Sequence, residues 1–279
     1  MPSQRWIDDA GSILIKVMIA LAVLFLLMPL FVVVSMSFDS RDYLGRFPPP
    51  SLSLRWYVSF FSQEYLIRGL KTSLALASSC AIISTTIGVL AALGIEQSPR
   101  KLRDVLTSLF LSPLVVPGVV IGFALLLFYS RVGVENAFLR LLGGHIVITF
   151  PYTVRTALAA FGGIRKSVLE AALSLGANER RAFWTVTLPL AKTGIAAGAV
   201  FAFAFSLDDV AVSLFLSDPH AYTLPVALVD MMYANFNLTI AAAAVLFVAA
   251  TTILMAVLDR LIGLDKLVGT GNLYRARLR

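Results

Sequence analysis

The sequence predicts an all-α integral membrane protein with six transmembrane helices and one helical segment on the cytoplasmic side, between the fourth and fifth helices. Hydrophobic residues make up 58% of the 279 residues, and the mean hydropathy is +0.86. Charged residues make up only 14%, against about 25% in soluble domains. A polar stretch, residues 165–192, interrupts the apolar pattern. A chain of this composition belongs in lipid and places one short structured segment in water.

The six spans are predicted from the length of the apolar stretches. A helix needs about 20 apolar residues to cross the hydrocarbon core of a bilayer. Four stretches of that length carry no charge: residues 17–38, 72–95, 105–130 and 231–258. Two more contain charges: residues 141–164 hold Arg155, and residues 193–217 hold Asp208 and Asp209.

These spans divide the chain into a cytoplasmic N-terminus (residues 1–12), a six-span membrane domain (residues 13–265) and a basic cytoplasmic tail (residues 266–279). The first apolar run is longer than the core of a typical signal peptide, so we expect it to be a retained helix.

Lysine and arginine residues orient the spans. With the N-terminus in the cytoplasm, the inner segments hold 15 of these residues and the outer segments hold 7. Cytoplasmic loops of membrane proteins carry the excess of positive charge. Both termini and the 165–192 segment are therefore expected inside. The net charge of +7 is then an orientation signal, and nucleic acid is not expected as a partner.

The polar segment predicts two short helices joined by a tight turn. Ser167 and Glu170 have the S-x-x-E spacing of a capping box, which satisfies free N–H groups at a helix start. Gly176 suits the turn, because glycine adopts positive φ without strain. Asn178 is placed to cap the second helix, and Pro189 to mark the start of the fifth span. Local chemistry leaves open whether Glu170 only caps and Gly176 only turns.

The spacing across this segment resembles the signature of permease subunits of binding-protein-dependent ABC importers. The pattern is E-A-A-x3-G, then nine residues, a hydrophobic residue, one further residue, and L-P. It is matched at Glu170, Ala171, Ala172, Gly176, Leu188 and Pro189. The hydrophobic position, usually Ile in the family, is Val186 here. The resemblance covers nearly the whole chain.

This resemblance implies a coupling helix that docks on a separate ATP-hydrolysing subunit and passes its movement to the spans. The contact would be formed by Glu170, Ala171, Ala172 and Gly176. The resemblance also implies two ATP-binding subunits inside, a second homologous permease, an extracytoplasmic solute-binding protein, and a place in the inner membrane of a bacterial cell. The chain has no G-x4-G-K-[ST] phosphate-binding loop, so it is not expected to be the enzyme of the assembly.

No cofactor or metal is expected. The two histidines, His145 and His220, lie far apart in the sequence, with no cysteine or carboxylate at metal-ligand spacing.

Charges and prolines inside the spans are candidate pathway residues. A charge near the bilayer centre costs roughly 2.5 kcal/mol or more, so Asp208 and Asp209 suggest a function. Neighbouring side chains on a helix point about 100° apart, so one carboxylate is expected to face the pathway. Arg155 is a further intramembrane charge, and Pro117 is expected to kink the third span. As alternatives, the aspartates pair with an arginine of another subunit or cap a helix break, and Arg155 forms a structural ion pair.

Two pairs of glycines at i and i+4 predict close helix packing. They are Gly118 with Gly122 in the third span, and Gly194 with Gly198 in the fifth.

The stretch from Ser206 to Ser213, S-L-D-D-V-A-V-S, resembles the spermidine/putrescine branch of these permeases. It implies inward movement of a polyamine or related cation, attracted by an acidic lining. The first alternative is the same importer class with another solute, such as iron, a phosphonate, an opine or an amino-acid derivative. The others are an ion-driven secondary transporter and an integral-membrane enzyme, for which the sequence offers no catalytic cluster.

Overall fold

The computed structural model describes residues 3–262, with side chains from residue 11 onward except at positions 255, 258, 259, 261 and 262. Within this range the chain is helical and contains no strand, which confirms the all-α prediction. The predicted tail, residues 266–279, lies outside the described residues.

The helices are α1 (Ser3–Ser37), α2 (Arg55–Ser62), α3 (Glu64–Gln97), α4 (Arg100–Leu111), η1 (Ser112–Val115), α5 (Gly118–Val132), α6 (Ala137–Gly162), α7 (Lys166–Ser174), α8 (Glu179–Ala182), η2 (Phe183–Thr187), α9 (Leu188–Asp208), α10 (Ser213–Leu216), α11 (Leu224–Ala234) and α12 (Thr239–Ile262).

Four helical stretches among these residues are long and apolar enough to cross a membrane. They are Gly11–Ser37, Glu64–Gln97, Ala137–Gly162 and Glu179–Asp208. A fifth is added if the bent pair Arg100–Val115 and Gly118–Val132 forms one span. The membrane-protein class is confirmed, and the count of six spans stays a prediction.

The third predicted span is not one kinked helix. Its two halves meet at 100°, so the expectation of a continuous span over residues 105–130 is wrong. The cause lies in two prolines four residues apart, Pro113 and Pro117, which both lack an N–H group for the helix. The residue before a proline is also pushed toward extended backbone, and Val116 has φ −86° and ψ 129°.

The sixth predicted span, residues 231–258, is also wrong as a single helix. The chain leaves α11 at Ala234 and begins α12 at Thr239. In the connection, the side chain of Asn237 accepts a hydrogen bond of 2.9 Å from the Thr239 N–H group. Asparagine favours turns because its side chain bonds to nearby backbone in this way.

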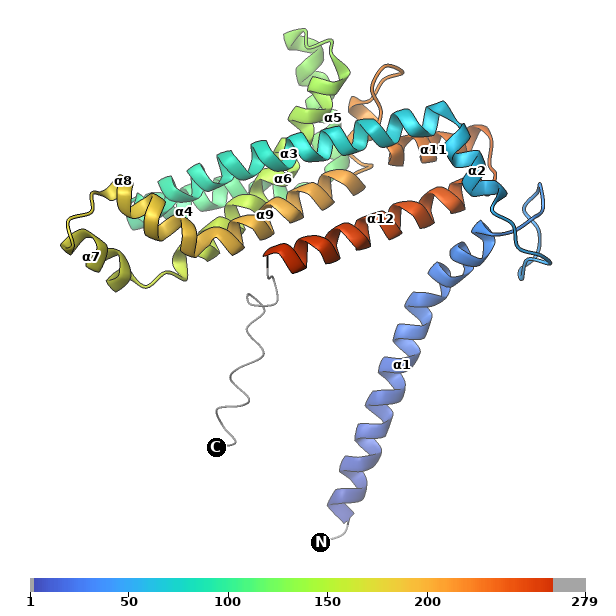
Figure 1. Cartoon of the computed structure of the whole chain (residues 1–279), viewed down its shortest axis with the longest axis horizontal. Helices are drawn as coiled ribbons and strands as arrows, with labels where there is room; N and C mark the ends of the chain where they lie inside the picture. The colour runs from blue at the N-terminus through green and yellow to red at the C-terminus, as the bar shows by residue number, and fades with distance from the viewer. Residues whose placement is uncertain (1–2, 263–279) are drawn as a thin grey trace. The chain divides into compact units, whose positions relative to one another are not determined.

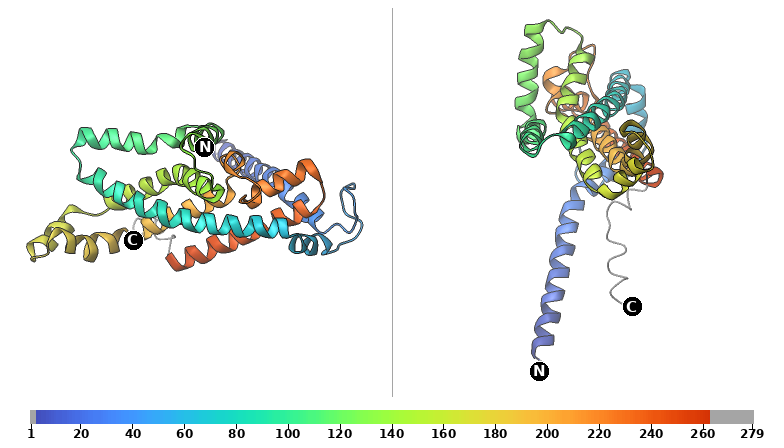
Figure 2. Two further views of the ribbon diagram at one scale, coloured as in Figure 1. Left: turned by 90° about the horizontal axis from the view of Figure 1, so that it is seen from above. Right: turned by 90° about the vertical axis from the view of Figure 1, so that its left-hand side faces the viewer.

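The chain divides into two compact units, which we describe separately. Within the described range, the larger comprises residues 65–229 and 250–262. Its long helices α3, α6 and α9 run side by side, with α7 and α8 at one end (Figures 1 and 2). Its apolar core is formed by two buried clusters. One contains Leu76, Leu141, Ile148, Val212 and Leu216, and the other contains Ala92, Ala157, Phe161 and Ala191.

The glycine pairs lie at close contacts in this unit, as predicted. A Cβ atom at Gly194 of α9 would lie 2.6 Å from the Cβ of Ala160 in α6. A Cβ atom at Gly122 of α5 would lie 3.1 Å from the Cα of Val212. Contacts under about 3.4 Å leave no room for a side chain, so these helices depend on glycine for their approach.

The smaller unit comprises residues 1–64 and 230–249. Met36, Trp56, Leu238 and Ala242 form a buried apolar cluster in this unit. The Trp56 Nε1–H group donates to the backbone oxygen of Asp39 at 2.8 Å. The Arg41 guanidinium donates to the Asp39 carboxylate, and this hydrogen bond holds the pKa of Asp39 below its usual value. The loop after α1 is therefore tied down by polar contacts.

Candidate functional site

The polar segment forms a helix, a glycine turn and a second helix. Gly176 follows α7 with φ +89°. The N–H of Ala177 donates to the carbonyl of Ala172 at 3.1 Å, and the N–H of Gly176 donates to that of Leu173 at 2.9 Å. These two bonds form a complete Schellman motif, which closes a helix through a left-handed residue. The predicted role of Gly176 in the turn is confirmed.

The start of each helix tests the capping predictions. Asn178 caps α8, because its side chain accepts from the Arg181 N–H group at 2.8 Å, as predicted. The capping box at Ser167 is wrong. Helix α7 begins at Lys166 after Arg165, which makes no side-chain capping bond, so Ser167 already lies inside the first turn. Glu170 is thus not required for a cap.

Helix α7 and the turn after it carry several exposed side chains. Glu170 and Ala171 are exposed, Ala172 is half-buried, and Leu175 is 89% exposed. A leucine this exposed on a polar turn has no local packing role. Because no described residue of this chain covers it, the segment presents a mixed polar and apolar surface.

Pro189 lies in the first turn of α9, which begins at Leu188, so its predicted place at the start of the fifth span is confirmed. Helix of a different kind precedes it: the helical stretch runs from Glu179 to Asp208, and the five residues before Leu188 form a wider π-type turn. In that turn the N–H of Leu188 donates to the carbonyl of Phe183, five residues back. Pro189 has no N–H group for a regular bond, and the widened turn accommodates it without ending the helix. The segment is therefore joined directly to α9 by continuous helix.

The fifth predicted span is interrupted near its far end. Helix α9 ends at Asp208, residues 209–212 form a break, and α10 begins at Ser213. The Asp209 carboxylate accepts from the N–H groups of Val212 at 3.1 Å and Ser213 at 2.9 Å, and from the Ser213 hydroxyl at 3.1 Å. Asp209 therefore caps the break, which is one of the alternatives that the sequence left open.

Asp208 has the opposite environment. It is exposed, and its carboxylate has no hydrogen bond or ion pair with any residue whose side chain the structure describes. Phe205 and Phe201, also exposed, lie about one and two turns earlier, respectively, on the same face of α9.

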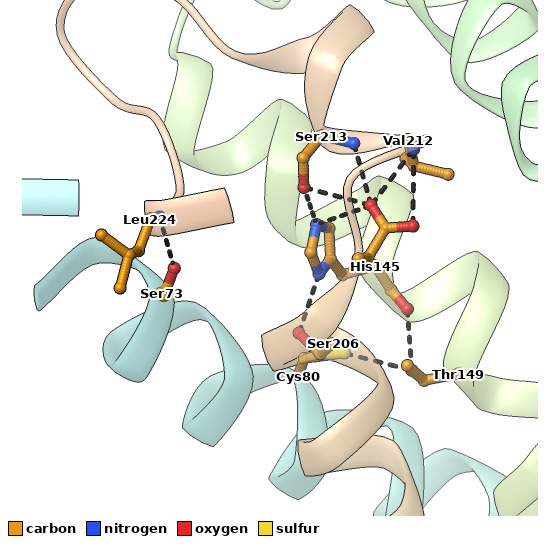
Figure 3. Close-up of polar contacts among 9 residues, drawn as sticks. Ser73, Cys80, His145, Thr149, Ser206, Val212, Ser213 and Leu224 are labelled. Carbon is orange, nitrogen blue, oxygen red and sulfur yellow. Dashed lines mark hydrogen bonds and ion pairs between the residues drawn. The ribbon is translucent and has the colours of Figure 1, made fainter. Parts of the chain in front are cut away.

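The break packs on a buried histidine that the sequence did not single out. His145 of α6 is fully buried, and its Nδ1 atom lies 2.8 Å from the Ser206 hydroxyl. Its Nε2 atom lies 2.9 Å from the Ser213 hydroxyl and 3.8 Å from the Asp209 carboxylate. Figure 3 shows the ring between Ser206 and Ser213. The partners are 61 and 68 residues away in sequence, so no local motif signals them.

The polar contacts continue from His145 toward α3. The Thr149 hydroxyl donates to the His145 backbone oxygen at 2.7 Å. The same hydroxyl lies 3.1 Å from the sulfur of Cys80, as Figure 3 shows. It also lies 2.8 Å from the Ser84 hydroxyl. These side chains are all buried, so a hydrogen-bonded layer crosses the interior of the larger unit.

The remaining predicted residues lie elsewhere. Arg155 is exposed on α6, and among the described residues it has no ion-pair partner, so no intrachain pair supports the structural alternative. Pro117 precedes α5 at the sharp bend and is exposed. The structure brings neither residue to Asp208 by a recorded contact. No group of three or more potential metal ligands occurs in the described range.

Comparison with known proteins covers both parts of the site. Residues 84–264 match the family described as "Binding-protein-dependent transport system inner membrane component". The spermidine/putrescine transport system permease protein PotC of Escherichia coli (strain K12) is 28% identical over 249 residues, 89% of this chain and 93% of that protein. The putrescine transport system permease protein PotI of the same strain is 27% identical over 244 residues, 85% of this chain and 86% of that protein. The molybdate/tungstate transport system permease protein WtpB of Pyrococcus abyssi is 25% identical over 171 residues, 61% of this chain and 68% of that protein.

Solved structures show the same fold at lower identity. A chain of a bacterial ABC transporter involved in the import of the acidic polysaccharide alginate is 17% identical, with a TM-score of 0.72 over 93% of this chain and 98% of that chain. A chain of the MetNI methionine ABC transporter in an inward-facing conformation is 20% identical, with a TM-score of 0.61 over 71% of this chain and 94% of that chain.

Proposed function

Because the chain belongs to the family of binding-protein-dependent transport system inner membrane components, we propose that it is the permease subunit of an ABC importer that moves a small cation inward. The observation that carries this proposal is the exposed helix–glycine–helix segment, which continuous helix joins to the span that ends at Asp208. A surface for an energy source, on α7, is thus connected through the Gly176 turn to the helix that ends at a charged residue for a solute.

The segment at residues 165–192 is the proposed contact with the ATP-binding subunits. Glu170, Ala171, Ala172 and Gly176 lie on or beside the exposed helix α7, and the two alanines allow close approach of another surface. Leu188 and Pro189 lie where the π-type turn ends and α9 begins. A displacement of α7 by a bound partner is transmitted to α9 through this helical connection.

The proposed assembly has two ATP-binding subunits on the inside, a second homologous permease beside this chain and an extracytoplasmic solute-binding protein outside. Hydrolysis of ATP resides on the partner subunits. Their closure pulls the segment, the spans turn from inward-facing to outward-facing, and the binding protein releases its solute into the gap. The surplus of lysine and arginine on the inner segments supports a place in the bacterial inner membrane with both termini in the cytoplasm.

Asp208 is the proposed polar element of the solute pathway. Its carboxylate is exposed and has no partner among the described side chains, so it can attract a cation, which fits a polyamine. Two relatives named for spermidine or putrescine transport support this solute class. The relative named for molybdate and tungstate supports the alternative that the solute is not a polyamine. Iron, a phosphonate, an opine or an amino-acid derivative are the other candidates. Arg155 and Pro117 are secondary candidates for the solute pathway. Arg155 is an exposed cation, and Pro117 lies at a sharp bend.

The proposal is tested by reconstituting the chain in liposomes with the ATPase, second permease and binding protein encoded beside it. We expect uptake of radiolabelled putrescine or spermidine that requires ATP and all subunits. Uptake by this chain alone without ATP would establish the ion-driven transporter instead. ATP-dependent uptake of a different solute, with none of either polyamine, would keep the importer and reject the cation.

A further inference from the structure

The ring of His145 joins the two helical pieces on either side of the break. Ser206 lies near the end of α9 and Ser213 at the start of α10, and each hydroxyl contacts one ring nitrogen. We infer that His145 is a positioning residue: it fixes the break at residues 209–212 and so sets where Asp208 stands in the solute pathway. This inference rests on the proposed function.

One arrangement of protons satisfies every polar group in this cluster. The Ser213 hydroxyl donates to the Asp209 carboxylate, so Ser213 has only its lone pairs to offer the ring. His145 then donates from Nε2 to Ser213 and accepts at Nδ1 from the Ser206 hydroxyl. A neutral histidine with its proton on Nε2 meets both requirements. The ring thereby completes a chain of hydrogen bonds from Ser206 to Asp209.

The backbone around His145 leaves little freedom for the break. A Cβ atom at the neighbouring Gly144 would lie 2.4 Å from Leu216 and 2.9 Å from Val212. The Thr149 hydroxyl donates a hydrogen bond to the His145 backbone carbonyl. Helix α6 therefore seats residues 212–216 closely and presents a fixed ring to both serines.

Direct contact with a solute is a poorer account of His145. The residue is fully buried, whereas Asp208 is exposed. Two ring nitrogens already have protein partners, so no polar atom of the ring is left for a ligand. Its effect on transport therefore passes through the break.

The test compares three variants of the reconstituted importer. His145→Leu removes both bonds, and His145→Gln keeps a donor and an acceptor on one side chain. His220→Leu is the matched control, because His220 is exposed and its side chain makes no hydrogen bond with a described residue, although it lies near Asp218. Ser206→Ala removes a single bond and serves if His145→Leu does not assemble.

The direct readout is amide hydrogen exchange of Val212 and Ser213, whose N–H groups bond to Asp209. We expect exchange to be faster by about tenfold or more in His145→Leu, because local opening becomes easier, and unchanged in His220→Leu. ATP-dependent uptake should fall by about tenfold or more in His145→Leu. In His145→Gln, uptake should recover in part. If His145→Leu assembles and its amide exchange is unchanged, the inference is overturned. If His145→Leu does not assemble, unchanged amide exchange in Ser206→Ala overturns the inference. Faster exchange with wild-type uptake overturns it too.

Failure of the proposed function would look different. If Asp208→Asn leaves uptake of every cation unchanged, Asp208 is not in the pathway. The exchange experiment would still decide whether His145 fixes the break.

Discussion

Asp208 and Asp209 are adjacent in the chain, yet their carboxylates have opposite surroundings. The Asp209 side chain is 8% exposed and accepts hydrogen bonds from Val212 and Ser213. Asp208 is exposed and unpaired within the described residues. Helix α9 ends at Asp208, and the backbone turns the two side chains apart. The sequence predicted such a separation, because neighbouring side chains on a helix point about 100° apart.

The same substitution at these neighbours should therefore have different effects. Asparagine caps a helix about as well as aspartate, so Asp209→Asn should fold normally and keep most of its transport. Asp208→Asn should also assemble normally, but it loses a charge whose attraction to a cation at 4 Å is roughly 4 kcal/mol at an effective dielectric constant of about 20. We expect uptake of a polyamine to fall at least about tenfold in Asp208→Asn, measured at equal amounts of assembled complex. Equal uptake by the two variants would remove Asp208 from the pathway.

A cysteine at position 208 tests whether this residue meets water. The natural cysteine, Cys80, is fully buried, so Asp208→Cys adds an exposed thiol to a chain with little background reactivity. We expect a membrane-impermeant, positively charged methanethiosulfonate reagent to label Asp208→Cys in the assembled importer, and solute to slow the reaction. The unmodified chain is the control. A thiol that reacts only with a lipid-soluble reagent would place residue 208 against lipid.

Gly176 and Gly133 form a natural pair for testing the coupling segment. Both have positive φ, +89° and +74°, and neither would place a Cβ atom within 4 Å of another residue. A non-glycine residue pays roughly 1–2 kcal/mol in such a conformation. Valine at either site should therefore destabilise to a similar extent. Only Gly176→Val should abolish transport, because it distorts the surface proposed to meet the ATPase.

The measurement combines membrane insertion, co-purification of the ATPase and ATP-dependent uptake. We expect normal insertion of both variants and loss of ATPase binding or uptake in Gly176→Val alone. Wild-type uptake in Gly176→Val would reject the coupling assignment. An equal loss in Gly133→Val would attribute the effect to general strain.

Local chemistry explains which parts of the site were predictable. Gly176 and Asn178 act through backbone a few residues away, so their roles follow from sequence. The start of α7 was missed because S-x-x-E spacing is common and does not require a capping role. Pro189 lies in the first turn of α9 as predicted, but the π-type turn before it was not predicted, because no residue type signals such a turn.

The tertiary part of the site was not predictable from one sequence. His145 gains its role only when α6 brings it to Ser206 and Ser213. Spacing in sequence gave no reason to join them. The same limit applies to the third span, where two prolines predicted a kink but not a bend of 100°. Apolar length predicts a helix that can cross the membrane, and it is silent on where breaks fall.

The contact between α6 and α9 offers a last prediction, on assembly of the membrane domain. Gly194 faces Ala160, where an added Cβ atom would lie 2.6 Å away, and both groups belong to helix backbones that cannot shift cheaply. Gly94 of α3 is also helical, but an added Cβ atom there meets nothing within 4 Å. Overpacking in a well-packed core typically costs about 1–3 kcal/mol. Gly194→Leu should thus lower the thermal stability of the purified complex and reduce its yield, whereas Gly94→Leu should not. Both variants add the same apolar side chain, so comparison of their melting temperatures in one detergent isolates the effect of the contact. Equal melting temperatures would show that α6 and α9 are not closely packed at Gly194.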